Sequence, residues 1–419
     1  MSFTSAPSGP RWRDVYLAAT ARGITVCGDF LAATALALAL QTRGAGGMAV
    51  AGVMLASAVP LMLLAPVAGR LADRMDSRML LTSAGVLQVT AALALAYTTD
   101  GLAMIALAGV VATGLALSSP TLGALVPDMV GRDLLPKATA YMSTAGALGM
   151  LVAPAVAGIL VGQFGTRVPL LVSAATYLAN IAAAFLLRTR RGGRVATADQ
   201  AAAAALAPAW RLRADTLLVT LMAGVAVTIA AVTAVNVADV FFTRETLHAS
   251  TTMYGLLLAT WTATMLVGAW LAARIGRRSD DGRLSVILLG LLGATSVVIL
   301  ACSTVQHVLW LVPLFVIGGI FNGAENVIGS LVVSRRVPAA VRGRAIGAFV
   351  GTINAANVIG FVLGGLLLAV LAPRSVLALA GVAGVVAVFC CIPPLLRAIR
   401  REPRAAESTP APAPVEVAV

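Results

Sequence analysis

The chain contains twelve runs of about 20 or more mostly apolar residues, separated by short polar breaks. A helix needs about 20 such residues to cross the ~30 Å hydrocarbon core of a bilayer. The runs are far longer than the roughly 10-residue alternating strands of a membrane β-barrel, and only helices and closed barrels satisfy their backbone polar groups in lipid. The sequence therefore predicts an all-α membrane protein with twelve transmembrane helices. The expected spans are residues 15–40, 48–68, 79–98, 102–126, 138–163, 168–187, 216–242, 252–273, 284–302, 308–333, 345–370 and 374–396.

Charged residues support this interpretation by their number and their position. They make up only 11% of the chain, against about 25% in ordinary soluble domains, which excludes a soluble globular protein. Lys and Arg collect in the cytoplasmic loops of membrane proteins. With the N-terminus placed in the cytoplasm, the basic residues all fall on the cytoplasmic side except Arg43, Arg167, Arg244 and Arg374. We therefore expect both termini in the cytoplasm, and we assign the net charge of +13 to topology rather than to a nucleic-acid partner.

The spans divide into two sets of six. The longest polar stretch, residues 188–215, separates an N-terminal half (15–187) from a C-terminal half (216–396), with residues 1–14 before them and a Pro- and Ala-rich, disordered tail (397–419) after them. The loop Gly69–Arg78 after span two is echoed by Gly268–Arg277 after span eight. Internal duplication of this kind is typical of secondary transporters, so we expect two pseudo-symmetric halves.

Motifs for other chemistry are missing from the sequence. The four cysteines lie in apolar segments without metal-binding spacing, and the two histidines fall in expected outer loops. There is no P-loop, zinc signature or nucleophile elbow, so we expect neither an enzyme nor a cofactor nor a metal site. Transport energy must then come from an ion gradient or from the gradient of the substrate itself.

The loop Gly69–Arg78 is a candidate conformational latch. Gly69 allows two helices to approach closely, Asp73 can face the positive end of a neighbouring helix, and Arg74 and Arg78 can pair with Asp128. Such a cluster would hold one conformational state. The alternative is that these arginines are simply part of the positive-inside charge.

Two acids inside the expected spans are candidates for proton coupling or substrate binding. Charged groups within the bilayer are costly and therefore usually functional, and an acid shielded from water can exchange protons. Asp29 lies in the middle of span one, and Glu325 lies in span ten between Asn322 and Asn326. For Asp29 a purely structural role remains open, because Arg22 lies two turns earlier on the same face.

Four more residues are candidates for the cavity wall. Asn354 and Asn357 lie one turn apart on span eleven and form either an interhelical hydrogen-bond seam or part of the cavity. Asn236, one turn from Asp239 near the outer end of span seven, either joins the site or meets the lipid headgroups. Trp261 lies within span eight and is a candidate for the cavity lining.

The loop Gly69–Arg78 resembles the G-x-x-x-D-R-x-x-[RK] signature of the major facilitator superfamily, and the resemblance extends over all twelve spans. Gly28-Asp29, the stretch Pro127–Ala138 and the stretch Val337–Arg344 resemble the twelve-span branch that exports drugs, macrolides and siderophores. In that family the loop contacts span eleven, which implies Arg344 as a further latch residue. The second-half loop departs from the pattern, with Ala272 where Asp73 would align.

The resemblance implies a monomeric proton antiporter in a bacterial plasma membrane that exports an amphipathic small molecule by alternating access, as in multidrug resistance. Uptake of a metabolite by a permease or uniporter is the alternative. The spans are rich in Ala, Leu, Val and Gly rather than in the polar and aromatic groups that line sugar carriers, which favours export. A membrane-embedded enzyme or scaffold is a further alternative, but the clustered catalytic groups that an enzyme needs are missing.

Overall fold

The structure, a computed structural model, describes residues 9–191, 216–276, 279–336 and 342–407. Most of the expected linker 188–215 and the end of the expected tail lie outside these residues. The main helices are α1 (Trp12–Thr42), α2 (Gly46–Arg74), α3 (Ser77–Tyr97), α4 (Gly101–Phe164), α5 (Arg167–Leu186), α7 (Thr216–Phe241), α8 (Thr251–Gly276), α9 (Asp281–Thr304), α10 (Leu311–Arg336), α11 (Arg342–Val370) and α12 (Pro373–Glu407). A π-helical turn, Phe242–Thr246, follows α7, and a 3₁₀ turn, Val308–Trp310, precedes α10.

The described helices are long and apolar enough for twelve membrane spans, as the sequence predicts. Helix α4 supplies two of them, a first arm (Gly101–Gly131) and a second arm (Asp133–Phe164). Gly131 separates the arms with φ 73° and ψ 178°, a conformation that is essentially restricted to glycine. Pro127, expected just after span four, therefore lies within the first arm. Helix α12 continues to Glu407, so the expected tail begins as a helix.

Asp residues fix the starts of two helices. The side chain of Asp76 accepts a hydrogen bond from Arg78 N at the start of α3, at 2.7 Å, and Asp100 accepts one from Ala103 N at the start of α4, at 2.8 Å. These N-caps satisfy backbone donors that a helix cannot satisfy itself. The two aspartates therefore stabilise the first turns of α3 and α4.

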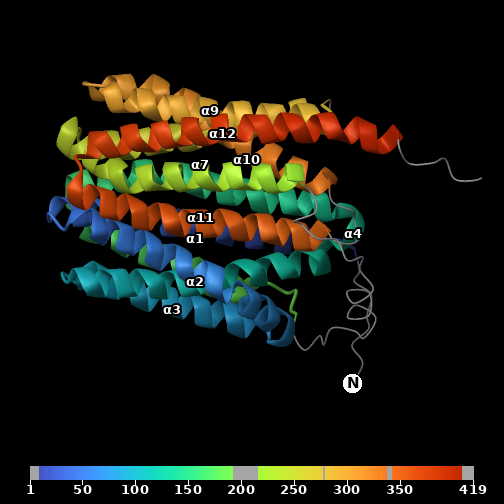
Figure 1. Cartoon of the computed structure of the whole chain (residues 1–419). Helices are drawn as coiled ribbons and strands as arrows, with labels where there is room; N and C mark the ends of the chain where they lie inside the picture. The colour runs from blue at the N-terminus through green and yellow to red at the C-terminus, as the bar shows by residue number, and fades with distance from the viewer. Residues whose placement is uncertain (1–8, 192–215, 277–278, 337–341, 408–419) are drawn as a thin grey trace, which may run out of the picture.

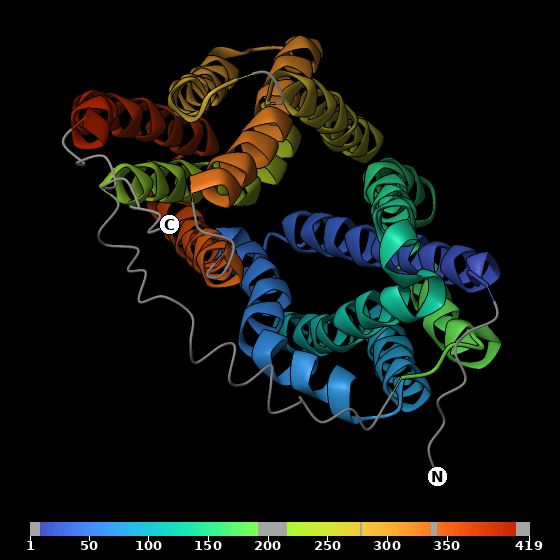
Figure 2. The ribbon, with the colours of Figure 1, turned by 90° about the vertical axis from the view of Figure 1, so that its right-hand side faces the viewer.

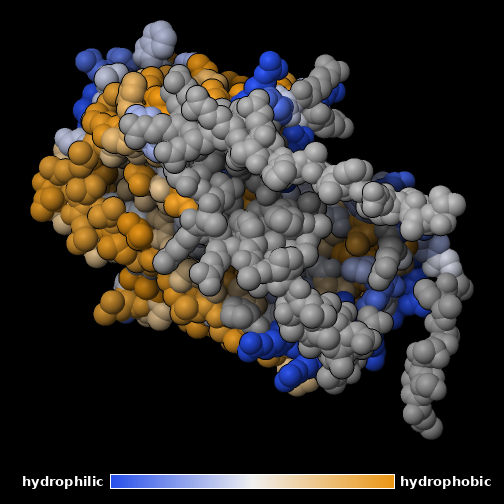
Figure 3. All heavy atoms as spheres, turned by 45° about the vertical axis from the view of Figure 1, so that its right-hand side comes forward, coloured by the Kyte–Doolittle hydropathy of each residue, from blue (hydrophilic) through white to orange (hydrophobic). Residues whose placement is uncertain are grey.

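The helices form two bundles, α1–α5 and α7–α12, which Figure 2 shows nearly along the helix axes. Within the first bundle α1 packs on α4 and α5, and within the second α8 packs on α10 and α12 on α9. The main contacts between the bundles join α2 to α11 and the second arm of α4 to α8. Figure 1 shows that the spans run roughly parallel to one another, and Figure 3 shows a broad apolar surface on their sides.

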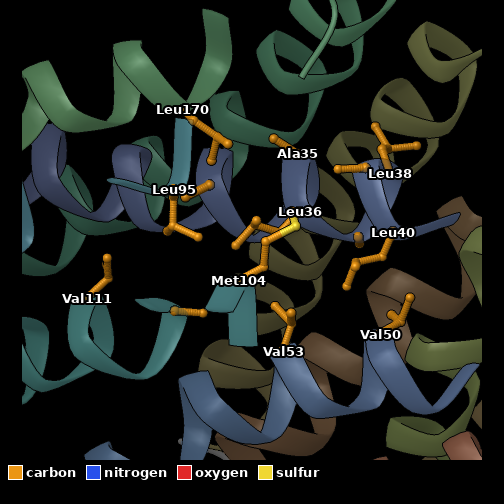
Figure 4. Close-up of a cluster of buried hydrophobic side chains, with 14 of the residues drawn as sticks. Ala35, Leu36, Leu38, Leu40, Val50, Val53, Leu95, Met104, Val111 and Leu170 are labelled. Atoms are coloured by element: carbon orange, nitrogen blue, oxygen red, sulfur yellow. The ribbon is translucent and has the colours of Figure 1, made fainter. Parts of the chain in front are cut away.

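The bundles meet at one end of the molecule, which we call the loop end because it carries the connections 43–45, 98–100 and 371–372. The hydrophobic cluster there combines α1, α2, α3, α4 and α5 with α7 and α8, and Figure 4 shows its centre around Leu36, Met104 and Val53. Across the bundles, Gln41 Nε2 donates a hydrogen bond to Glu245 Oε1 at 3.0 Å. At the opposite, terminal end, the clusters of described residues each stay within one bundle.

Candidate functional site

A cavity of about 430 Å³ lies between α1, α2, α3, the first arm of α4 and α11. We call it the Asp29 cavity. Its wall is mostly Ala, Leu, Val, Met and Phe, and its polar lining residues are Asp29, Ser57, Asn354 and Asn357. A volume of this size accommodates a drug-sized molecule, and a mostly apolar wall with a few polar groups is typical of small-molecule sites.

Contacts between α1 and α5 position Asp29. At Gly28 the helices are so close that an added Cβ atom would overlap Thr176 Oγ1, and Ser173 Oγ donates a hydrogen bond to the Gly28 carbonyl oxygen at 2.9 Å. One turn further along α5, Tyr177 OH donates to Asp29 Oδ1 at 2.9 Å. The other carboxylate oxygen, Oδ2, is buried without a hydrogen-bond partner among the described residues.

Arg22 does not serve as the partner of Asp29, contrary to the structural alternative. Its guanidinium donates instead to Ser119 Oγ on the first arm of α4, at 3.1 Å. Tyr177 takes the place expected for Arg22. Since a tyrosine hydroxyl is neutral, the charge of an ionised Asp29 stays uncompensated by this contact.

The amides of α11 line the same cavity from the second bundle. Asn357 Oδ1 accepts a hydrogen bond from Thr233 Oγ1 on α7 at 2.8 Å, so it contributes both to an interhelical contact and to the cavity wall. Asn354 lies one turn earlier on the same wall. The two roles that the sequence leaves open for these asparagines are thus combined in Asn357.

Glu325 occupies a different, smaller cavity of about 60 Å³ inside the second bundle, which we call the Glu325 cavity. Thr295 Oγ1 donates a hydrogen bond to Oε1, and Asn322 Nδ2 lies 3.5 Å from Oε2. Glu325 is only 8% exposed, whereas Asn326 and Ser330 on the same cavity wall are exposed. The cavity has room for about two water molecules.

A third cavity, of about 70 Å³, contains Asn236, Trp261 and the buried Asp239. Trp261 packs edge-to-face against Phe315, with ring centroids 5.5 Å apart. The candidate residues therefore do not share one cavity among the described residues. The structure joins Asp29 with the two α11 amides, joins Glu325 with Asn322 and Asn326, and separates both groups from Asn236 and Trp261.

At the terminal end, Arg191 joins the two acids of the expected latch. Its NH2 atom lies 2.9 Å from Asp73 Oδ1, and its NH1 atom lies 4.0 Å from Asp128 Oδ2. NH1 also donates to the Ala124 carbonyl oxygen at 2.8 Å. The backbone of Arg191 exchanges two hydrogen bonds with Ser77. The described cluster therefore connects α2, α3 and α4 to the segment that follows α5.

The arginines of the loop Gly69–Arg78 have other contacts than those expected. Arg78 donates to the carbonyl oxygens of Ala184 and Phe185 at the end of α5, at 2.8 and 3.1 Å, which favourably places a cation at a helix C-terminus. Arg74 is exposed. Nothing lies within 4 Å of a Cβ atom added to Gly69, so its expected close helix contact is absent from the described residues. Arg344 lies in the first turn of α11, but its side chain is outside the described part.

The family model described as the Major Facilitator Superfamily matches residues 18–279 and 216–417, so the two matches together span both bundles. The chain belongs to the Major Facilitator Superfamily. It is accordingly a multi-pass membrane transporter and not an enzyme.

Solved structures of other superfamily transporters share the fold. A bacterial homolog of the human lysosomal transporter Spinster, inward-facing and unoccupied, has 13% identity and a TM-score of 0.72 over 97% of this chain and 100% of that chain. A mutant of the peptide transporter POT with alafosfalin has 15% identity and a TM-score of 0.72, covering 96% of each chain. A mutant of the nucleoside transporter NupG has 14% identity and a TM-score of 0.73 over 91% of this chain and 99% of that chain. No curated protein sequence matches the chain.

These neighbours include a peptide transporter and a nucleoside transporter, and they do not support the narrower resemblance to the drug, macrolide and siderophore exporters of the superfamily. At such low identities the likeness shows the fold alone. Substrate and direction of transport therefore have to be argued from the chain itself.

Sequence reasoning missed Arg191 and Tyr177. Arg191 is one of several arginines at the start of the linker, which a membrane protein explains by topology alone. The buried Asp14 accepts hydrogen bonds from Thr189 N and Thr189 Oγ1 and so holds the same segment, but Arg11 and Arg13 lie nearer in the sequence and gave no signal of this contact. Tyr177 carries no signal of its own in an apolar span.

Proposed function

We propose that this superfamily member exports an amphipathic small molecule, such as a drug, a siderophore or a secondary metabolite, in exchange for protons. The Asp29 cavity carries the proposal, because about 430 Å³ of mostly apolar wall with four polar side chains suits a molecule that is largely apolar with a few polar atoms. A sugar or another strongly hydrated solute would need more hydrogen-bonding groups to replace its water.

The distribution of basic residues supports a direction. With the terminal end in the cytoplasm of a bacterial cell, both termini lie inside and the loop end faces outward. Packing of α2 against α11 and of α4 against α8 closes the loop end, so the cavity in this state would be filled from the cytoplasm. We infer that the two halves, 15–187 and 216–396, rock around the cavity as units, the monomer being sufficient for transport.

Glu325 is the proton carrier in this proposal. Its cavity is too small for a drug-sized molecule but accommodates water, and its carboxyl group has hydrogen-bond donors in Thr295 and Asn322. The exposed Asn326 and Ser330 continue the polar face of α10 toward the terminal end. This stripe offers a path for water between Glu325 and the cytoplasm. One proton entering down a membrane potential supplies roughly 2.3 kcal/mol per 100 mV.

The test is accumulation of candidate compounds in inside-out membrane vesicles, with and without an imposed pH gradient that is acidic inside. Export predicts accumulation in the vesicles that collapses when a protonophore removes the gradient. Vesicles from cells without the protein provide the control. Accumulation that occurs only in right-side-out vesicles would identify an uptake permease, and transport that ignores the gradient would identify a uniporter.

A further inference from the structure

We propose that Asp29 binds the positive charge of the substrate, so that the transported molecules are lipophilic cations, above all amines. This inference rests on the proposed function and names the substrate class for its cavity. It starts from Asp29 Oδ2, which is buried and has no hydrogen-bond partner among the described residues. A buried polar atom without a partner is costly, and in a native protein it calls for an explanation such as a functional role.

The rest of the cavity wall cannot neutralise this carboxylate. Asp29 is the one ionisable side chain among the residues that line the cavity. Tyr177 donates a hydrogen bond to Oδ1 but brings no charge. Arg22, the basic residue two turns earlier on α1, donates to Ser119 instead. When Asp29 is ionised, the compensating positive charge must therefore come from the molecule that occupies the cavity.

The arrangement of polar groups in the cavity places a second requirement on the ligand, which is a polar atom that reaches the amides of α11. Asp29 lies on α1 of the first bundle, whereas Asn354 and Asn357 reach the cavity from α11 of the second bundle. A ligand with a cationic group at Asp29 and a polar atom at the amides would touch both bundles at once. Between these points the wall is apolar, which favours hydrocarbon or aromatic groups.

Glu325 lies outside the Asp29 cavity, so the proposed cation site and the proposed proton site are two different acids. Adjacent residues of α11 face different cavities, since Asn354 lines the Asp29 cavity and Ile353 lines the Glu325 cavity. Substrate and proton would thus bind to different acids, and α11 is the element that both sites share. Binding of a cation should therefore depend on Asp29 and be nearly independent of Glu325.

The test uses two probes of almost the same size and shape, tetraphenylphosphonium and tetraphenylborate, which carry opposite charges. Their binding to the full-length protein in lipid nanodiscs is measured at pH 8 by equilibrium dialysis, with empty nanodiscs as blank. The wild-type protein should bind the phosphonium at least about tenfold more tightly than the borate. Asp29→Asn should weaken phosphonium binding about tenfold or more, the size expected for losing one interaction with a charged group.

Two further variants separate the charge of Asp29 from its hydrogen bond and from the other acid. Tyr177→Phe removes the hydrogen bond to Asp29 without removing the charge, so it should keep phosphonium binding within about threefold, and Glu325→Gln should keep it within about twofold. Thermal unfolding of each variant in the same nanodiscs identifies any that is misfolded. If Asp29→Asn is misfolded, Asp29→Glu replaces it and should retain the preference for the phosphonium.

Three results would overturn the proposal: equal binding of both probes to the wild type, phosphonium binding that survives Asp29→Asn, or a loss in Glu325→Gln as large as in Asp29→Asn. Failure of the proposed function is distinguishable. A protein that binds the phosphonium through Asp29 but transports it without any response to a pH gradient keeps the cation site and loses the proton antiport.

Discussion

At Gly28 a single missing side chain sets the position of the acid beside it. Helix α1 lies so close to α5 there that an added Cβ atom would overlap Thr176 Oγ1, and the same contact brings Tyr177 to Asp29. The sequence pair Gly28-Asp29 therefore has a physical explanation. The glycine allows the approach, and the approach provides a hydrogen bond for the acid.

Gly28→Ala should destabilise the protein by about 1–3 kcal/mol, the usual cost of forcing extra atoms into a packed contact. The double variant Gly28→Ala/Thr176→Ala should recover most of this loss, because it removes the overlapping hydroxyl. Thermal unfolding in detergent measures both. Gly123→Ala is the control, since an added Cβ atom there meets nothing within 4 Å. A double variant no more stable than the single one would contradict the explanation.

Glu325→Gln should abolish accumulation driven by a pH gradient while leaving downhill exchange of substrate intact. Glutamine retains the shape and the hydrogen-bonding capacity of the protonated acid but cannot release a proton, so the coupled step is lost and the movement of the bundles is kept. Counterflow in proteoliposomes measures exchange, and a pH jump measures accumulation. Asn326→Asp serves as the control for polarity at the same cavity. Gradient-driven accumulation in Glu325→Gln would show that a residue other than Glu325 couples transport to protons.

At the scale of elements, Arg191 makes the segment after α5 part of the first bundle. It lies between Asp73 and Asp128, and its backbone is bonded to Ser77. Exposed ion pairs are individually worth only ~0–1 kcal/mol, but this arginine also donates to a backbone carbonyl, which fixes its geometry. We propose that the cluster of Arg191, Asp73 and Asp128 acts as the latch on one conformational state.

Asp73→Asn should slow transport by up to about fivefold, the equivalent of ~1 kcal/mol, and leave equilibrium binding of substrate unchanged within about twofold. Substrate binding should be unaffected because Asp73 lies at the terminal end and does not line the Asp29 cavity. Arg191→Gln should have the same effect, and the double variant should be little slower than either single variant. A large loss of substrate binding in Asp73→Asn would count against the latch.

The spans themselves were predictable because the hydrocarbon thickness fixes their length, and the two acids were recognisable because charge is rare in lipid. The hydrogen-bond partners of those two acids could not be predicted from the sequence. Whether Asp29 faces Arg22 or Tyr177 depends on the rotation of α1 against α5, and composition does not determine that angle. The turn at Gly131 was not predicted either, since the expected spans 102–126 and 138–163 leave a loop at 127–137, where the structure has two helical arms joined at one glycine.

At the scale of the whole molecule, close contacts between glycines join the two bundles at the loop end. A Cβ atom added to Gly158 on the second arm of α4 would lie 3.0 Å from Gly255 Cα on α8. The nearby polar contact between Gln41 and Glu245 also crosses from one bundle to the other. The closed loop end therefore depends on backbone approach more than on charge.

Gly158→Leu should shift the population away from the state with a closed loop end, because the side chain cannot fit between the helices. Spin labels at Ala140→Cys and Ala273→Cys, two exposed positions on α4 and α8 at the terminal end, should then move closer together as that end closes. Double electron–electron resonance measures the distance. Gly290→Leu, at a position with open space around it, should leave the distance distribution unchanged. An unchanged distribution in Gly158→Leu would contradict the assigned contact.

The wall of the Asp29 cavity also bears on how selective such a transporter can be. An apolar surface separates two compounds that differ by one methylene group by only about 1–3 kcal/mol, whereas a site built from many hydrogen bonds rejects a mismatched compound far more strongly. Under the export function proposed above, a host cell would therefore gain tolerance to a whole homologous series of compounds rather than to one. An inhibitor of this protein would have to gain its selectivity at the carboxylate and at the few other polar groups of the cavity, because the hydrocarbon wall offers little on which to discriminate.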